Sequence, residues 1–181
     1  MLHPPTKEQK EILRALESSN VSVDAVAGSG KTTTILHIAQ TFKDKRICCI
    51  TYNAKLKNET KEKINIMGIH NLSVFTYHGS CNCFYLNTND LVDDLKLKSS
   101  IDLSIEPKNP INYDIIIIDE VQDMNIVYAK YILKFISDNL NTDTRLVILG
   151  DKNQCINQYN DARHRFLTLG SEIFINNLPW I

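Results

Sequence analysis

A short stretch, residues 21–34, constrains the fold of this chain more than any other part of it. It reads V-S-V-D-A-V-A-G-S-G-K-T-T-T, in which an apolar β-like run leads directly into a glycine-containing loop, a Lys-Thr pair and a helical pattern. Gly28 and Gly30 allow the backbone to curl so that several amides point at one anion, and the N-terminus of the following helix adds its positive end. A strand, a loop and a helix in this order predict a phosphate site within an α/β fold.

The loop also supplies specific groups for a nucleoside triphosphate. Lys31 provides a positive charge for the β- and γ-phosphates, and the Thr32 hydroxyl is placed to ligate Mg²⁺. Ala25 stands where the strict pattern G-x-x-x-x-G-K-[ST] has its first glycine. The strand before the loop and the helix after it nevertheless favour a phosphate site over an ordinary glycine-rich turn. The residues that we expect around the triphosphate are Ala27, Gly28, Ser29, Gly30, Lys31, Thr32 and Thr33.

Two carboxylates follow the most apolar run of the chain. Ile115–Ile118 is a run of isoleucines, which indicates a strand covered on both faces, and Asp119 and Glu120 come directly after it. Beside a phosphate loop, Asp119 is suited to hold magnesium, directly or through water, and Glu120 to polarise the attacking water. Asp123 is open to two interpretations: it orients the neighbouring loops, or it only N-caps the helix that begins near Asn125.

A further apolar run, residues 146–149, also ends in polar residues, G-D-K-N-Q at positions 150–154. Open α/β sheets bind ligands at the carboxyl edge of their strands. The amide of Gln154 both donates and accepts hydrogen bonds, so this residue is a candidate to sense the γ-phosphate or the water that attacks it. The alternative is an ordinary glutamine of a surface loop.

Short apolar runs alternate with amphipathic stretches along the chain, which is typical of a parallel α/β sheet. With 181 residues, of which 43% are hydrophobic, we expect a single domain over residues 1–181 with a core of its own. Residues 87–112, rich in Asn, Asp, Lys and Ser, are interpreted as a short insertion with one helix near residues 91–97, and residues 172–175 as a β-like run. The expected strands are residues 21–26, 46–51, 72–75, 114–118 and 144–149, and the expected helices are residues 7–16, 31–42, 54–67, 79–86 and 125–139.

The charge balance and the cysteines narrow the class of protein. The formal net charge is −1, so any contact with nucleic acid must be a local patch. No apolar run approaches the ~20 residues that span a bilayer, and the N-terminus lacks the apolar segment of a signal peptide. We therefore expect no membrane partner and an intracellular location. The five cysteines have neither a disulfide framework nor the spacing of a zinc site, and we expect small core or semi-buried thiols.

Three of these segments together resemble motifs I, II and III of superfamily 1 helicases of the UvrD/Rep type. They are residues 27–32 (A-G-S-G-K-T), 119–123 (D-E-V-Q-D) and 150–154 (G-D-K-N-Q). Weaker matches occur in the family's order. Residues 6–9 (T-K-E-Q) are similar to the Q motif, residues 51–53 (T-Y-N) to motif Ia, and residues 75–79 (F-T-Y-H-G) to motif Ib. The Tyr-Asn form of motif Ia looks closest to a viral and eukaryotic recombination-regulating branch.

The resemblance implies the N-terminal RecA-like motor domain, domain 1A, of such a helicase. Its fold would be that of a P-loop NTPase, with a mostly parallel central sheet and helices on both faces, and its cofactors would be ATP and Mg²⁺. The roles that it implies for single residues are adenine recognition for Gln9, phosphate binding for Lys31, metal binding for Thr32 and Asp119, general-base catalysis for Glu120, and coupling to nucleic acid for Gln122 and Gln154.

Single-stranded DNA is the partner that the resemblance implies, along a track lined by Tyr52, Asn53, Thr76 and His78. Part of this track can also be argued from the residues alone. Tyr52 can stack a base of any sequence, and Thr76 and His78 can contact phosphates without reading bases. The alternatives are a core aromatic at a strand end for Tyr52 and a buried histidine with satisfied hydrogen bonds for His78.

The family's engine has two RecA-like lobes with ATP between them, and this chain carries no recognisable motif IV, V or VI. The resemblance therefore implies a second RecA-like lobe as a partner, in the same chain or a separate one. It also implies that the isolated domain binds ATP·Mg²⁺ weakly and hydrolyses it slowly, because the arginines of the second lobe are missing.

The main interpretation is the motor lobe of an ATP-dependent DNA helicase, acting in the cytoplasm, the nucleus or a viral replication compartment. One alternative is a non-catalytic scaffold fragment that binds ATP and single-stranded DNA. Another is a P-loop nucleotide kinase, but neither the arginine-rich lid nor the acceptor pocket of such an enzyme is found in the sequence.

Overall fold

A computed structural model describes all residues of the chain except 1, 27, 109–111, 154–164, 169 and 175–177. Within the described residues the chain forms a five-stranded, parallel sheet with the order β1-β5-β4-β2-β3. The predicted α/β class with a parallel central sheet is confirmed, and each strand begins and ends within two residues of its predicted bounds. The strands are β1 Val21–Asp24, β2 Ile47–Thr51, β3 Leu72–Thr76, β4 Ile115–Ile118 and β5 Arg145–Gly150.

The isoleucines of β4 lie at the centre of the sheet, between β2 and β5. Because side chains alternate along a strand, Ile116 and Ile118 enter one core cluster, and Ile115 and Ile117 enter the other. All four are at most 1% exposed. A strand can be wholly apolar only where both of its faces are covered, and β4 therefore carries no polar residue before Asp119.

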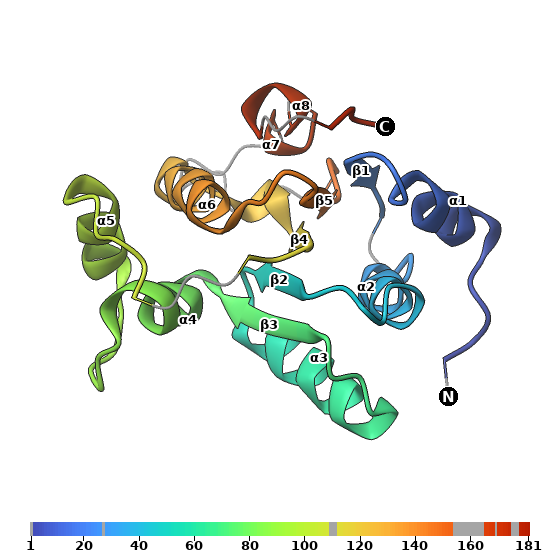
Figure 1. The fold of residues 1–181 in the computed structure, drawn as a ribbon, viewed down its shortest axis with the longest axis horizontal. Helices are drawn as coiled ribbons and strands as arrows, with labels where there is room; N and C mark the ends of the chain where they lie inside the picture. The colour runs from blue at the N-terminus through green and yellow to red at the C-terminus, as the bar shows by residue number, and fades with distance from the viewer. Residues whose placement is uncertain (1, 27, 109–111, 154–164, 169, 175–177) are drawn as a thin grey trace.

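Helices cover both faces of the sheet, as Figure 1 shows. The cluster that contains Ile115 is completed by α1 Lys7–Ala15, α2 Lys31–Thr41 and α3 Ala54–Met67. The helices on the other face, which complete the cluster that contains Ile116, are α4 Tyr77–Cys81, the π-helix η1 Asn82–Leu86, α5 Asp94–Asp102, α6 Ile126–Asn139 and α7 Arg165–Thr168.

The helix predicted over residues 79–86 begins earlier and changes type along its length. The Thr76 hydroxyl accepts a hydrogen bond from the Gly79 backbone N–H at 3.1 Å and caps α4, which starts at Tyr77. From Asn82 the chain widens into the π-helix η1, which ends at Asn87 with a left-handed φ of 50°. Sequence periodicity does not separate an α-helical turn from a π-helical one, so this change was not predicted.

Residues 87–112, interpreted as an insertion, contribute to the core instead of only crossing the surface. α5 begins at Asp94, with Asp93 as its N-cap, so the helix expected near residues 91–97 lies about one turn further along the chain. Leu97 is fully buried and Val92 is 8% exposed, both in the cluster that α6 completes. α5 is therefore packed against the body of the domain.

The β-like run predicted at residues 172–175 is wrong, because Gly170–Ile173 forms the short helix α8. The Phe174 backbone N–H donates to the Gly170 carbonyl at 2.8 Å, and the Phe174 ring is 1% exposed. A Cβ atom on Gly170 would lie 2.5 Å from Cδ1 of Ile148. This glycine thus lets a helical turn approach β5 closely enough to bury Phe174. Beyond α8, Asn20 at the start of β1 forms a parallel bridge with Trp180.

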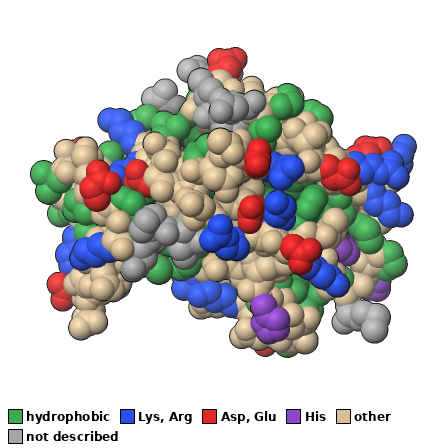
Figure 2. Space-filling view, viewed as in Figure 1, with side chains coloured by type: hydrophobic (Ala, Val, Ile, Leu, Met, Phe, Trp, Pro, Cys, Tyr) green, Lys and Arg blue, Asp and Glu red, His purple; other side chains and the backbone are tan. Residues whose placement is uncertain are grey.

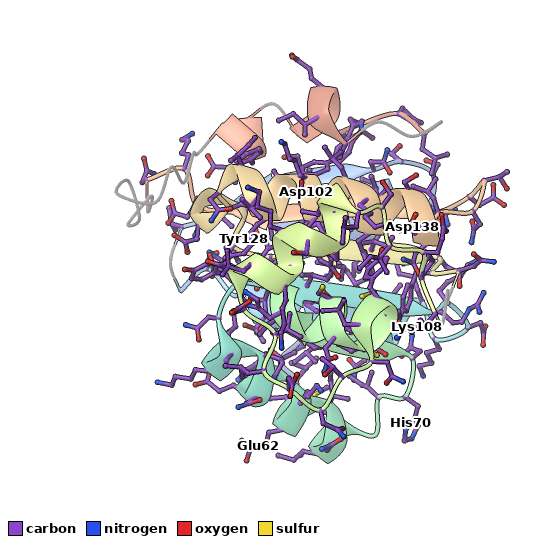
Figure 3. All side chains as sticks on the ribbon, turned by 90° about the vertical axis from the view of Figure 1, so that its left-hand side faces the viewer. Glu62, His70, Asp102, Lys108, Tyr128 and Asp138 are labelled. Atoms are coloured by element: carbon purple, nitrogen blue, oxygen red, sulfur yellow. The ribbon has the colours of Figure 1, made fainter. Side chains whose placement is uncertain are left out.

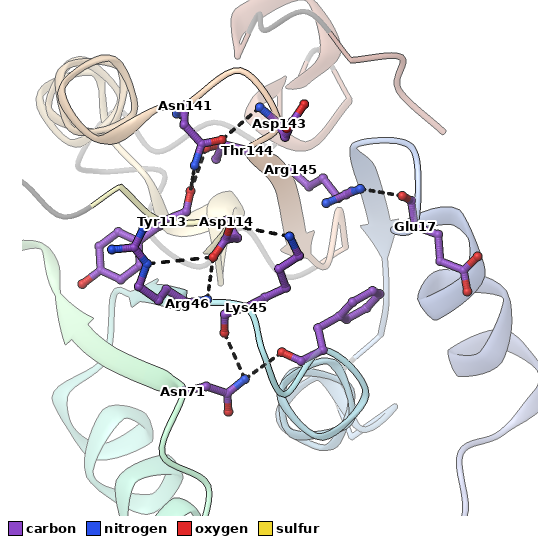
Figure 4. Close-up of polar contacts among 11 residues, drawn as sticks. Glu17, Lys45, Arg46, Asn71, Tyr113, Asp114, Asn141, Asp143, Thr144 and Arg145 are labelled. Atoms are coloured by element: carbon purple, nitrogen blue, oxygen red, sulfur yellow. Dashed lines mark hydrogen bonds and ion pairs between the residues drawn. The ribbon is translucent and has the colours of Figure 1, made fainter.

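Figure 4 shows polar contacts at the amino-terminal ends of the strands. Asp114, just before β4, accepts a hydrogen bond from the Arg46 backbone N–H at 2.8 Å and lies 3.7 Å from Nζ of Lys45. The Asn71 amide donates to the backbone carbonyls of Phe42 and Lys45 at 2.9 and 3.1 Å. These contacts tie loops together at the amino edge. The carboxyl edge, where open α/β sheets bind ligands, carries the predicted site.

Candidate functional site

The predicted phosphate loop leaves the carboxyl end of β1 and enters α2. Gly28 and Gly30 both have left-handed backbones, with φ of 76° and 91°, which favour glycine. Gly30 is the N-cap of α2 and provides no side-chain cap, so the first amides of this helix are available to an anion. The Ala25 backbone N–H donates to the Gly150 carbonyl at 2.8 Å, which holds the start of the loop beside β5. Ala27 lies outside the described residues.

Lys31, the first residue of α2, forms an ion pair with Glu120, which follows β4. Nζ of Lys31 lies 3.2 Å from Oε2 of Glu120, and the two side chains are only 11% and 20% exposed. Gln122 extends the contact to β5: its Nε2 donates to the same Glu120 oxygen at 2.5 Å, and its Oε1 accepts from the Asp151 backbone N–H at 3.1 Å. One glutamine therefore connects the ends of two strands.

Glu120 has a strained backbone. Its φ is 56°, in the left-handed region, which costs a residue with a Cβ atom roughly 1–2 kcal/mol. Such a conformation persists where the surroundings hold it, and here Lys31 and Gln122 hold the carboxylate. This backbone conformation places the Glu120 carboxylate beside Lys31.

Asp119 is 1% exposed. Burial, and secondarily the charge of Glu120, raises the pKa of Asp119 to about 7, against the opposing effect of Lys31. Its Oδ1 accepts a hydrogen bond from the Glu120 backbone N–H at 3.0 Å. A buried carboxylate whose ionised form is this poorly stabilised is suited to bind a cation.

These groups share one cavity of about 350 Å³, lined by the glycines of the loop, Lys31, Thr32, Thr33, Leu56, Lys63, Asp119 and Glu120. Thr32 and Asp119, the two predicted ligands, both face it. A hydroxyl and one carboxylate suit Mg²⁺, which usually keeps waters and phosphate oxygens as its other ligands. The donor set therefore fits a magnesium–triphosphate complex.

Gln9, the predicted adenine reader, lies next to this loop at 6% exposure. Its Oε1 accepts from the Thr6 backbone N–H at 3.0 Å, which completes a capping box at the start of α1. Its Nε2 donates to the Thr34 hydroxyl of α2 at 3.1 Å. A second cavity, of about 380 Å³, is lined by Gln9 together with Ile12, Val26, Ser29 and Lys31 among others. Because Lys31 borders both cavities, a base bound here would lie next to the triphosphate.

The four residues predicted to contact a strand lie at the ends of β2 and β3, which are neighbours in the sheet. Tyr52 is 36% exposed. Oδ1 of Asn53 accepts from the Lys55 backbone N–H at 2.8 Å and caps α3, as Thr76 caps α4. Nε2 of His78 lies 2.8 Å from Asp94. Three of the four therefore already use their side chains in intramolecular hydrogen bonds, and the Tyr52 side chain presents an exposed aromatic face.

Tyr77 and Tyr128 were not predicted as part of this surface. Tyr77 stacks on Tyr128 with ring centroids 4.7 Å apart, and the Tyr128 ring meets the Tyr52 and His78 rings edge-on, each at 5.9 Å. Tyr128 lies in a stretch that reads as an ordinary amphipathic helix, and no sequence signal links it to motif Ia. Tyr77 lies inside motif Ib, so its position was available as a signal.

Two further predictions concern the ends of β4 and β5. Asp123 does not cap α6, because Asn125 is the N-cap. Burial and the charge of Glu120 raise the pKa of Asp123. Its other interpretation, a residue that orients the neighbouring loops, stays a prediction. Gln154, the predicted phosphate sensor, lies outside the described residues.

The distribution of charged side chains over the surface does not by itself indicate a kind of ligand. Figure 2 shows acidic and basic side chains interspersed on one face of the molecule, in agreement with the net charge of −1. Among the helices of the described residues, none combines the length and the apolar composition needed to cross a membrane. Any charged ligand is therefore recognised by local groups such as those of the phosphate loop.

Comparisons with known proteins agree with this geometry. A family model described as an AAA domain matches residues 9–160 of the chain. No curated protein matches it. Among solved structures, the Pyrococcus furiosus Hef helicase domain has a TM-score of 0.58 at 12% identity, over 98% of this chain and 38% of that one.

Two further solved structures are similar. Bacteroides sp Pif1 in complex with ADP-AlF4 has a TM-score of 0.50 at 17% identity, over 82% of this chain and 32% of that one. The Sulfolobus solfataricus SWI2/SNF2 ATPase core in complex with dsDNA has a TM-score of 0.51 at 16% identity, over 96% and 38%. At these identities the likeness shows the fold, that of RecA-like helicase domains. The chain spans 32–38% of the length of these solved chains.

Proposed function

The chain belongs to the AAA domain family, and on that premise we propose that it is the ATP-binding motor lobe of an ATP-dependent DNA helicase. With a second RecA-like lobe, this motor translocates on single-stranded DNA by hydrolysing ATP. By its motifs we assign it to superfamily 1, UvrD/Rep type, in a viral or eukaryotic recombination-regulating branch. Its place of action is the cytoplasm, the nucleus or a viral replication compartment.

One observation carries the proposal: Lys31, Asp119 and Glu120 line a single cavity at the carboxyl edge of the sheet, with Lys31 3.2 Å from Glu120. A glycine-rich turn with a purely structural role does not need two carboxylates beside its lysine, and burying Asp119 in an apolar strand end is unfavourable. A site that binds and hydrolyses a nucleoside triphosphate does need these groups.

The chemistry follows from the position of each group. Backbone amides from Gly28 to Thr33 donate to phosphate oxygens, and Lys31 neutralises the β- and γ-phosphates. Thr32 and Asp119 would hold Mg²⁺, which would neutralise charge on the phosphates and orient them. Phosphates that attract Lys31 draw it from Glu120, and the freed carboxylate orients the attacking water and accepts its proton. The bond from the water oxygen to the γ-phosphorus forms as the bond from that phosphorus to the β,γ-bridging oxygen breaks, and ADP leaves with the bridging oxygen.

Hydrolysis must then be coupled to movement along the single-stranded DNA. Gln122 contacts both the Glu120 carboxylate and the backbone of Asp151, so a shift of Glu120 moves the loop after β5. We propose that Gln154, three residues after Asp151 in the sequence, completes this sensing. The single-stranded DNA lies along Tyr52, Asn53, Thr76 and His78, and a base stacks on Tyr52.

The ligands of two similar structures support this choice of ligands, although each was bound to its own protein. The Pif1 structure contains ADP-AlF4, and the SWI2/SNF2 core contains dsDNA. For this chain we propose ATP with Mg²⁺ as cofactors and single-stranded DNA as the polymer. The transition-state arginines come from the second lobe, so the isolated chain hydrolyses ATP slowly.

The test is ATP hydrolysis with and without single-stranded DNA, measured on this chain and on a chain extended to include a second lobe. We expect slow turnover in the first and DNA-stimulated turnover in the second. Lys31→Ala and Glu120→Gln should abolish the stimulated rate, whereas Lys43→Ala, at an exposed lysine just beyond the C-terminal end of α2, should retain it. A folded, extended protein that binds ATP and DNA without any stimulation would indicate a scaffold instead of a motor.

A further inference from the structure

α5 reaches the surface that carries Tyr52 and His78, although residues 87–112 match none of the motifs. Oδ1 of Asp94, in the first turn of α5, lies 2.8 Å from Nε2 of His78 and 2.8 Å from the Tyr128 hydroxyl. The carboxylate is an acceptor, so both the imidazole N–H and the phenol O–H donate to the same oxygen. Figure 3 views α5 from outside, with Tyr128 of α6 labelled beside it.

Tyr128 is the centre of the aromatic group. It stacks on the buried Tyr77 at 4.7 Å with an interplanar angle of 18°, and it meets Tyr52 and His78 edge-on. The ring of Tyr128 is itself only 6% exposed, so it supports the surface from below and does not offer a face to a ligand. A contact that holds the Tyr128 ring in place therefore also holds the rings of Tyr52 and His78, which pack against it.

We propose that Asp94 is a positioning residue for the strand-binding surface, holding Tyr128 and His78 in place so that Tyr52 and His78 present a prearranged face to single-stranded nucleic acid. This inference rests on the proposed function and deepens it. It makes residues 87–112 a part of the strand site through α5, in addition to their place in the core.

The contact has features that anchoring of α5 alone does not require. α5 is already held by Leu97 and Ser100, both fully buried, and is capped by Asp93. The side chain of Asp94 is 66% exposed, so it adds little burial to the helix. Burial opposes its ionisation, but the hydrogen bonds from Tyr128 and His78 together hold the pKa of Asp94 below its usual value. Asp94 is therefore an anionic acceptor whose two donors both belong to the aromatic group.

A short series of variants tests this role. The probe is a fluorescein-labelled single-stranded oligonucleotide, and its affinity is read from fluorescence anisotropy. Asp94→Ala removes the shared acceptor and should weaken binding about fivefold, the factor expected for one or two lost hydrogen bonds. Asp94→Asn keeps an acceptor oxygen and should stay within about twofold of the original chain. Asp102→Ala, at the exposed other end of α5, makes the same charge change and should leave binding unchanged.

A double-mutant cycle separates positioning from folding. Tyr128→Phe removes only the hydroxyl and should weaken binding to a similar extent, and Asp94→Ala combined with Tyr128→Phe should lose less than the product of the two single effects. ATP affinity, measured on the same preparations, should not change in any of these variants, because none of them lines the phosphate cavity. If Asp94→Ala loses ATP affinity, that variant disturbs the whole fold. The effect of Tyr128→Phe on oligonucleotide binding then decides whether the contact positions the aromatic group.

The outcomes distinguish this inference from the proposed function. If Tyr52→Ala weakens binding but Asp94→Ala and Tyr128→Phe do not, the positioning role is wrong while the strand site stands. If Asp94→Ala and Asp94→Asn both bind more tightly, Asp94 acts as a repelling charge and not as a positioning residue. If the original chain and Tyr52→Ala both fail to bind the oligonucleotide, the proposed function itself fails.

Discussion

The ammonium of Lys31 lies 3.2 Å from the carboxylate of Glu120, so the residue that we propose to bind phosphate and the residue that we propose as the general base are paired with each other. In the function that we propose, a triphosphate competes for Lys31 and thereby releases Glu120. This exchange would link binding to activation, because the carboxylate would become available to water only when phosphates hold the lysine. Both side chains are largely buried, which strengthens the pair relative to one in open solvent.

Glu120→Gln should separate binding from hydrolysis. The glutamine has no charge to hold Lys31, so ATP·Mg²⁺ affinity should be equal to or somewhat greater than that of the original chain. Turnover should fall by about 10²–10⁴-fold, the usual contribution of a general base. Titration with a fluorescent ATP analogue and single-turnover hydrolysis measure the two effects. Lys31→Ala is the matched comparison, since it should lose affinity as well as turnover. Equal affinity losses in both variants would contradict the exchange.

Asp119→Asn should stabilise the protein while removing magnesium binding. The pKa of Asp119 is raised to about 7 in the folded chain from 3.8, so the folded state binds this proton more tightly than the unfolded state. The free-energy cost of ionising Asp119 in the folded state is absent below pH ~4. It grows between pH ~4 and pH ~7 and is fully present above that range. At pH 8 without nucleotide, Asp119→Asn should therefore raise the free energy of unfolding by roughly 2–4 kcal/mol.

Denaturant unfolding at pH 5 and pH 8 checks this prediction. The gain from Asp119→Asn should be clearly smaller at pH 5, where the carboxyl of the original chain is mostly protonated. The exposed Asp102→Asn is the control and should show no comparable difference between the two pH values. A gain that does not depend on pH would mean that burial of the charge is not its cause.

Gly150→Ala should disturb the link between β4 and β5. A Cβ atom on Gly150 would lie 2.8 Å from Oε1 of Gln122 and 2.9 Å from Cγ2 of Val121, both closer than real contacts allow. Overpacking of this kind costs about 1–3 kcal/mol of stability. Displacing Gln122 also removes the hydrogen bond that its Nε2 donates to the Glu120 carboxylate, so this carboxylate loses one of the contacts that hold it in place. We expect a lower melting temperature together with slower hydrolysis. In a Gln122→Ala background the same substitution should cost less, because one of the two clashes is gone.

The sheet and the phosphate loop could be predicted because their signals are local. Buried parallel strands are continuous apolar runs, of which Ile115–Ile118 is the clearest, and the loop needs glycines at Gly28 and Gly30 for their left-handed backbones. The contact of Asp94 with His78 and Tyr128 could not be predicted, because it joins three helices and no residue type or spacing announces it. Residues 172–175 misled the prediction because burial of Phe174 is achieved by a helical turn, and a short apolar run alone does not distinguish the two.

Gln9→Ala should weaken ATP binding while leaving inorganic triphosphate unaffected. The Gln9 amide uses one acceptor position for the Thr6 backbone and one donor for the Thr34 hydroxyl. A primary amide has a second donor and a second acceptor position, and this remaining pair matches N7 and N6 of adenine. Losing such a bidentate contact costs about 1–3 kcal/mol, or roughly tenfold in affinity.

Competition titrations with ATP, GTP and tripolyphosphate measure the selectivity. Thr6→Ala is the control, since it removes the cap on α1 but keeps the amide. If tripolyphosphate weakens as much as ATP in Gln9→Ala, then Gln9 only braces the phosphate loop against α1.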